Sequence, residues 1–76
     1  MITLEKAKET AQKINPKMDA YYEYPDAYWF CISKPTKADL WDNAVIIKKK
    51  DGKLMTMFEY TMTPNYASIK PSLKQL

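Results

Sequence analysis

Several residue types that usually carry chemistry are scarce or missing in this chain of 76 residues. It has no histidine, one cysteine and one glycine. Without histidine, the commonest general base and metal ligand is missing, and one cysteine cannot complete a zinc site of the usual spacing. A phosphate-cradling loop of the G-x-x-x-x-G-K-[ST] type needs more than one glycine. The composition therefore predicts a protein that is not an enzyme and uses no cofactor or metal.

Arginine is absent as well, so all twelve basic residues are lysines, and the formal net charge is +3. The planar fork of arginine is the usual means of bidentate phosphate and guanine recognition. Its absence disfavours sequence-specific reading of nucleic acid. Lysines still bind phosphate as point charges, so weak, non-specific contact with single-stranded nucleic acid stays open as an alternative function.

Long apolar segments are also lacking. No run approaches the roughly 20 residues that span a bilayer, and the first fourteen residues, MITLEKAKETAQKI, carry charges where a signal peptide would be apolar. Cys31 cannot form an internal disulfide, which fits a reducing compartment, and its apolar surroundings favour a buried small hydrophobe. We therefore expect one small domain, residues 1–76, in the cytoplasm and without a membrane partner.

The N-terminal part predicts a helix over residues 3–15. Thr3 is a suitable N-cap, and Asn15-Pro16 ends the helix because the residue before proline avoids helical backbone angles. Apolar residues recur at spacings of three and four, which places them on one stripe: Leu4, Ala7, Ala11 and Ile14. The stripe is narrow and rich in alanine, so we expect the helix to lie close against a flat sheet.

The rest of the chain predicts strands near 18–24, 27–33, 43–49 and 54–60. Pro25-Asp26 and Asp51-Gly52 have the composition of turns. Thr63-Pro64 can open a short helical turn over 64–69. The expected fold is α+β, with the N-terminal helix packed on a mainly antiparallel sheet of about four strands.

Alternation along the strands predicts which side chains share a face. In the strand over 27–33, Tyr28, Phe30 and Ile32 oppose Ala27, Trp29, Cys31 and Ser33, so both faces are apolar. In the strand over 54–60, alternation puts Phe58 and Tyr60 on one face. One helix covers only one face of a sheet. The tail of the chain, a second copy or a partner must cover the other.

Aromatic residues are concentrated in the run YYEYPDAYWF, residues 21–30. The rings are core and half-buried surface on one interpretation, with Tyr22, Trp29 and Phe30 as the core residues. They form a protein-binding face on a second interpretation, and a stacking platform for single-stranded nucleic acid on a third. The acids within the run count against the third. The candidate residues for partner binding are Tyr21, Tyr24, Tyr28 and Trp29.

Lysines 48–50 and Lys53 flank the predicted Asp51-Gly52 turn. They are either a solvated tip that guards a strand edge from aggregation or a docking patch for an acidic partner. As candidate contacts at the rim of the aromatic face we include Lys48, Lys50 and Lys53. Asp39 and Asp42 fall in a predicted loop, where solvated or capping roles are typical.

The order of elements, with an aromatic strand followed by DNAVIIKKKDGKL, resembles small bacterial and phage-encoded domains over roughly residues 3–60. The matching residues are Tyr28, Phe30, Asn43, Val45, Lys49 and Gly52. The immunity protein 35 family and the PepSY module have this style, although the long insertion often found between these strands is missing here. The resemblance implies a non-enzymatic binding or inhibitory protein. The expected function is therefore binding of another protein or of a second copy, with a structural accessory role as a further possibility.

Overall fold

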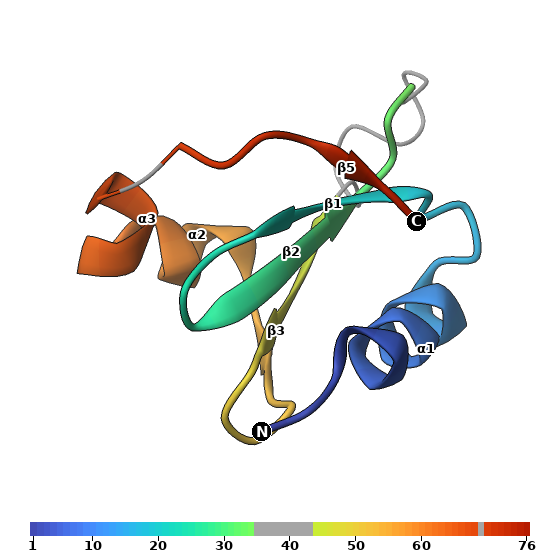
Figure 1. Cartoon of the computed structure of the whole chain (residues 1–76), viewed down its shortest axis with the longest axis horizontal. Coiled ribbons are helices and arrows are strands. Elements are labelled where there is room, and N and C mark those ends of the chain that lie inside the picture. Colours follow the sequence, from blue (N-terminus) through green and yellow to red (C-terminus); the bar gives the residue numbers. More distant parts are fainter. Residues whose placement is uncertain (35–43, 69) are drawn as a thin grey trace.

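The computed structural model of the chain describes residues 1–34, 44–68 and 70–76. Along the chain the elements are α1 (Leu4–Ile14), β1 (Ala20–Glu23), β2 (Ala27–Cys31), β3 (Ala44–Lys48), β4 (Leu54–Met55), α2 (Met57–Thr61), α3 (Pro64–Ser68) and β5 (Lys74–Gln75). The strands form an antiparallel sheet in the order β4-β3-β2-β1-β5. Figure 1 shows α1 on one side of this sheet and α2 and α3 on the other. The predicted α+β class is confirmed.

Helix α1 begins and ends as the sequence predicts. The Thr3 side chain accepts a hydrogen bond from the Lys6 N–H, and Asn15 is the C-cap. Ala7 and Ala11 are fully buried and belong to one hydrophobic cluster with Phe30 of β2. Because alanine has a short side chain, the helix lies close to the sheet along this stripe.

The two predicted turns are present. The Tyr24 N–H donates to the Ala27 carbonyl at 2.9 Å and closes the turn at residues 25–26. Gly52 has φ 73°, a left-handed backbone angle that glycine adopts without a Cβ clash. A Cβ at Gly52 would lie 3.4 Å from Cγ2 of Ile2, so the N-terminal segment packs beside the β3–β4 turn.

The predicted strand over 54–60 is wrong beyond Met55. Thr56 is the N-cap of α2: its side chain accepts from the Glu59 N–H, and the Glu59 carboxylate accepts from the Thr56 N–H. This reciprocal capping box turns the chain out of the sheet. Phe58 and Tyr60 consequently belong to a helix and share no strand face, as Phe58 is exposed and Tyr60 is buried.

The second sheet face is covered in part by the tail of the chain, one of the three coverings that the alternation allowed. Tyr60 of α2 packs with Tyr24, Ala27 and Ile46 in a second cluster, separate from the cluster beneath α1. The predicted division of the 27–33 strand is confirmed, since Tyr28, Phe30 and Ile32 all lie in the α1 cluster. The sheet therefore has a core on each side.

The remaining differences are at element ends. The predicted turn over 64–69 corresponds to α3, with Ile69 outside the described residues, as is Asn43 of the predicted third strand. The sequence did not predict β5, which pairs Gln75 with Ala20 and Lys74 with Tyr21. Within the described ranges, no helix has both the length and the apolarity needed to cross a membrane.

Candidate binding groove

Three of the four aromatic candidates are buried. Tyr21 and Tyr28 lie in the cluster beneath α1, each 8% exposed, with their ring centroids 6.3 Å apart. Tyr24 lies on the opposite face, where its ring meets those of Tyr60 and Tyr66 at 5.1 and 5.9 Å. These rings fill the two cores. Phe30 is buried as expected, whereas Tyr22 joins the half-buried residues, contrary to the core role considered for it.

Trp29, a core residue on the first interpretation, is only partly buried and packs against the edge of the second cluster. Its ring stacks on Tyr66 of α3 with centroids 5.7 Å apart and planes 24° from parallel, and it meets Tyr60 edge-on at 6.3 Å. Offset and edge-to-face arrangements of this kind hold a ring in a defined orientation. Trp29 is thus fixed on one side and open on the other.

The lysine candidates divide into two kinds. Lys50 and Lys53 are exposed at the β3–β4 turn, while Lys48 is partly buried. Lys49, on the α1 side, is already engaged: its ammonium lies 2.9 Å from Glu23 and 4.8 Å from the centre of the Tyr28 ring. The buried candidates Tyr21, Tyr24 and Tyr28 therefore share no exposed surface with Lys50 and Lys53.

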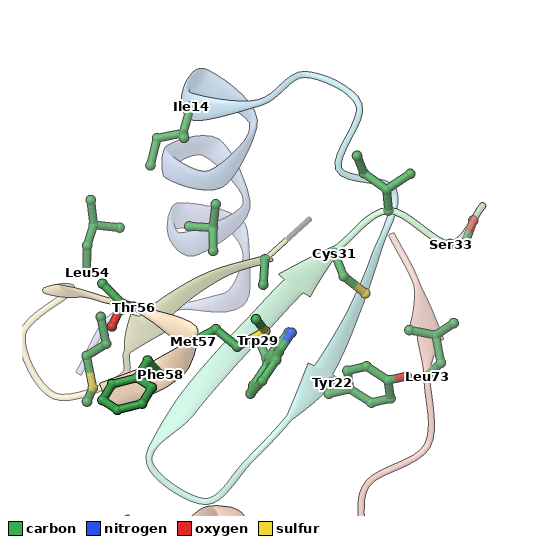
Figure 2. A pocket seen from close by; sticks show the side chains of 14 residues that line it. Ile14, Tyr22, Trp29, Cys31, Ser33, Leu54, Thr56, Met57, Phe58 and Leu73 are labelled. Carbon is green, nitrogen blue, oxygen red and sulfur yellow. The ribbon is translucent and has the colours of Figure 1, made fainter. Parts of the chain in front are cut away.

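A groove of about 670 Å³ opens where β4 ends and α2 leaves the sheet. Its described lining comes from α1, β1, β2, β3, β4, α2 and the segment before β5, and it is largely apolar. Figure 2 shows Trp29 and Tyr22 on one side of it and Phe58, Met57 and Leu54 on another. Ser33 and Thr56 add small hydroxyl side chains to the described lining.

The groove is bordered by an exposed apolar patch, the β4–α2 patch, which consists of Leu54, Met57 and Phe58. Their exposed fractions are 56%, 51% and 73%. Sequence reasoning missed this patch because it assigned Phe58 to a strand. The Thr56-x-x-Glu59 spacing was the signal that a helix starts here, and a helix of five residues cannot bury all of its large side chains.

A hydrogen-bond network anchors α2 and α3 to the β1–β2 turn. The Tyr60 hydroxyl donates to Oδ1 of Asp26 at 2.5 Å, and Asn65 also bonds this carboxylate. Burial alone raises the pKa of Asp26, but these hydrogen bonds outweigh it, and the pKa lies below its ordinary value of 3.8. Burial, together with the bond to Asp26, raises the pKa of Tyr60. At neutral pH the Asp26 carboxyl is therefore ionised and accepts the hydrogen bond, while the Tyr60 hydroxyl keeps its proton and donates it.

Cys31 lies at the wall of the groove but is itself buried. Burial and, to a lesser degree, the charge of Asp19 raise the pKa of its thiol. A raised pKa keeps the sulfur in its unreactive protonated form, which agrees with the packing role expected from the sequence. Asp39 and Asp42 lie outside the described residues.

Comparisons of the chain with protein-family models, with curated proteins and with solved structures give no match. The resemblance to immunity protein 35 and PepSY domains stays a prediction. The functional argument therefore rests on the groove and its surroundings.

Proposed function

We propose that this chain is a non-enzymatic, cytoplasmic protein-binding module that uses the groove between Trp29 and the β4–α2 patch. An immunity-type or phage-encoded inhibitor is the biological form that the resemblance suggests. The carrying observation is the combination of a largely apolar groove with three large, exposed apolar side chains at its border. Apolar surface that gathers around a groove marks an interaction site more often than isolated exposed residues do.

The residue types at the groove suit a protein partner. Tryptophan is enriched at interface hot spots, and Trp29 is held by stacking on Tyr66 while its other side stays open. Met57 is unbranched and polarizable, so it adapts its shape to a partner. A fixed ring beside an adaptable side chain gives both an anchor and a surface that can repack.

Burial of the other rings favours a protein partner over single-stranded nucleic acid. Stacking platforms present several aromatic faces in succession along a basic groove. Here Tyr21, Tyr24 and Tyr28 are at most 8% exposed, and the ammonium of Lys49 is bound to Glu23. Among the described residues the exposed rings are Phe58 and Tyr66, fewer than a platform with several successive stacking faces requires.

The proposal is tested by selecting random linear peptides on the immobilised protein and measuring their dissociation constants. We expect binders with apolar anchors whose affinity falls at least about tenfold for Phe58→Ser, since hot-spot residues carry that much or more. Met62→Ser is the matched control. Met62 is 74% exposed, like Phe58, but does not belong to the described lining of the groove.

Equal affinity for wild type and Phe58→Ser would contradict the proposed site. Failure to enrich any peptide would contradict the proposed function. Loss of binding in Met62→Ser to the same extent would also contradict it, because the effect would then follow general surface hydrophobicity and not the groove.

A further inference from the structure

We infer that the partner segment of this groove is acidic and amphipathic: apolar side chains enter the groove while neighbouring carboxylates meet the exposed Lys50 and Lys53. This inference rests on the proposed function and specifies the chemistry of the partner. It comes from the distribution of charge among the described residues. The carboxylates near the sheet are engaged within the chain, whereas the ammonium groups of Lys50 and Lys53 are not.

The carboxylates near the sheet already have partners. Glu23 lies 2.9 Å from Lys49 and 3.5 Å from Lys74. Asp26 accepts from Tyr60, and Glu59 is occupied by the capping box of α2. Asp19 accepts from both the N–H and the hydroxyl of Ser33, at 2.8 and 2.7 Å. These acids are therefore poor partners for a further cation.

Lys50 and Lys53 differ from Lys49 and Lys74, which both pair with Glu23. Among the described residues, no carboxylate lies within ion-pair distance of either ammonium. Asp51, between them, uses its carboxylate to accept the Lys53 backbone N–H at 3.1 Å. Both lysine side chains are exposed, so their charge faces solvent.

The backbone fixes these two lysines beside the patch. The Lys48 N–H donates to the Lys53 carbonyl, and the Gly52 N–H donates to the Lys48 carbonyl, each at 2.9 Å. Lys53 directly precedes Leu54, the first residue of the β4–α2 patch. A bound segment with apolar residues on the patch thus lies next to Lys53 and at the same turn as Lys50, two cations without an ion-pair partner among the described residues. Charge of the opposite sign speeds such an encounter and selects its register.

A second copy of this chain fits the site less well. The chain has a formal charge of +3, so two copies repel each other weakly. The carboxylates near the sheet of such a copy are already engaged, so a partner rich in free carboxylates matches Lys50 and Lys53 better.

The test uses three peptide libraries with the same apolar positions and acidic, neutral or basic residues between them. We expect the acidic library to give the tightest binders. Their affinity should fall about tenfold for the double variant Lys50→Gln/Lys53→Gln, as exposed ion pairs contribute modestly. It should also fall as added salt shortens the Debye length to about 10 Å at ~0.1 M.

The control variant is Lys6→Gln/Lys8→Gln, which removes the same charge from the N-terminal part of α1, away from the described lining of the groove. It should retain wild-type affinity. Equal enrichment of all three libraries, or unchanged affinity in Lys50→Gln/Lys53→Gln, overturns the acidic partner. If Phe58→Ser still abolishes binding in that case, the proposed binding function is retained and only the acidic character of the partner is rejected. Absence of binders from every library contradicts both.

Two further measurements test whether a second copy of the chain or a single-stranded nucleic acid occupies the groove instead. Sedimentation velocity over a range of concentrations should show a monomer, and a dimer that Phe58→Ser abolishes would overturn the inference in favour of self-association. A fluorescent single-stranded oligonucleotide should not compete with the acidic peptides. Competition that depends on Lys50 and Lys53 would replace the protein partner with nucleic acid.

Discussion

The hydroxyl of Tyr60 donates to Asp26 at 2.5 Å across 34 positions of sequence, and this bond ties α2 to the first hairpin of the sheet. Tyr60 is fully buried, so its hydroxyl has no access to bulk water. A buried donor on a charged acceptor is among the stronger hydrogen bonds in a protein. The position of the β4–α2 patch depends on this tie, because Phe58 and Tyr60 share one short helix.

Removal of the Tyr60 hydroxyl should weaken the fold. We expect Tyr60→Phe to lower the free energy of unfolding by about 1–2 kcal/mol, the usual range for a hydrogen bond to a charged group. Urea denaturation followed by tryptophan fluorescence measures this change. Tyr22→Phe is the matched control, because Tyr22 is half-buried and Figure 2 places it at the groove. A loss of equal size in both variants would refute the special role of Tyr60.

Stability should fall in acid. Asp26, Glu23 and Asp19 have folded-state pKa values below their ordinary ones: Asp26 through Tyr60 and Asn65 against the opposing effect of burial, Glu23 chiefly through Lys49, and Asp19 through Ser33. A lowered folded pKa means that the unfolded chain binds protons first as the pH falls. The contribution is complete above the ordinary values of about 4 and is lost as the pH drops through the folded ones. Urea midpoints at a series of pH values measure this loss.

The variant Asp26→Asn isolates one of these groups. Its stability should be lower at neutral pH, and its decline between about pH 5 and pH 2 should be shallower than that of the wild type. A parallel decline in the two proteins would show that Asp26 does not contribute to the acid sensitivity.

Gly52 should resist replacement because of its backbone angle. Alanine at φ 73° is strained, so Gly52→Ala should cost about 1–2 kcal/mol of unfolding free energy. The added Cβ meets Ile2 at 3.4 Å, which is ordinary contact, and the cost therefore comes from the backbone. Gly52→Asn should cost less, because asparagine tolerates left-handed angles. Thermal denaturation of both variants checks the order, and an alanine variant as stable as the wild type contradicts it.

The two phenylalanines should separate binding from folding. Phe58 is 73% exposed, whereas Phe30 is fully buried. We expect Phe58→Ala to change stability by no more than about 0.5 kcal/mol, and Phe30→Ala to cost about 3–5 kcal/mol. Chemical denaturation measures both. A large loss in Phe58→Ala would mean that Phe58 supports the fold, and the assignment of the β4–α2 patch as a binding surface would then be withdrawn.

Local patterns predicted most of the fold because they report local physics. The cap at Thr3, the alanine stripe and the break at Asn15-Pro16 define α1 from nearest neighbours. Alternation in residues 27–33 defined the two faces of β2 correctly. The prediction of a strand over 54–60 was wrong because alternating apolar residues also fit one turn of helix. The capping box of Thr56 and Glu59 stabilises the helix there.

The candidate site was harder to predict, since burial depends on contacts between distant segments. Nothing near Tyr21 or Tyr28 in the sequence shows that α1 covers them. The pairing of Lys49 with Glu23, 26 positions away, likewise separates it from Lys50, its neighbour in the chain. The sequence located Trp29 and the β3–β4 lysines, and the structure added the patch on α2.

The strand order β4-β3-β2-β1-β5 implies that the strands differ in how readily they detach from the sheet. The first four strands pair with their sequence neighbours, so the loops that their contacts close are much shorter than the loop closed by β5. Strand β5 pairs with β1 over more than fifty positions, and both of its residues are exposed. Two residue pairs, the bond from the Leu76 N–H to Asp19 and the ion pair of Lys74 with Glu23 offset the entropy of closing so long a loop. The backbone amides of β5 should therefore exchange with deuterium first, leaving the outer edge of β1 transiently unpaired while the central strands remain protected.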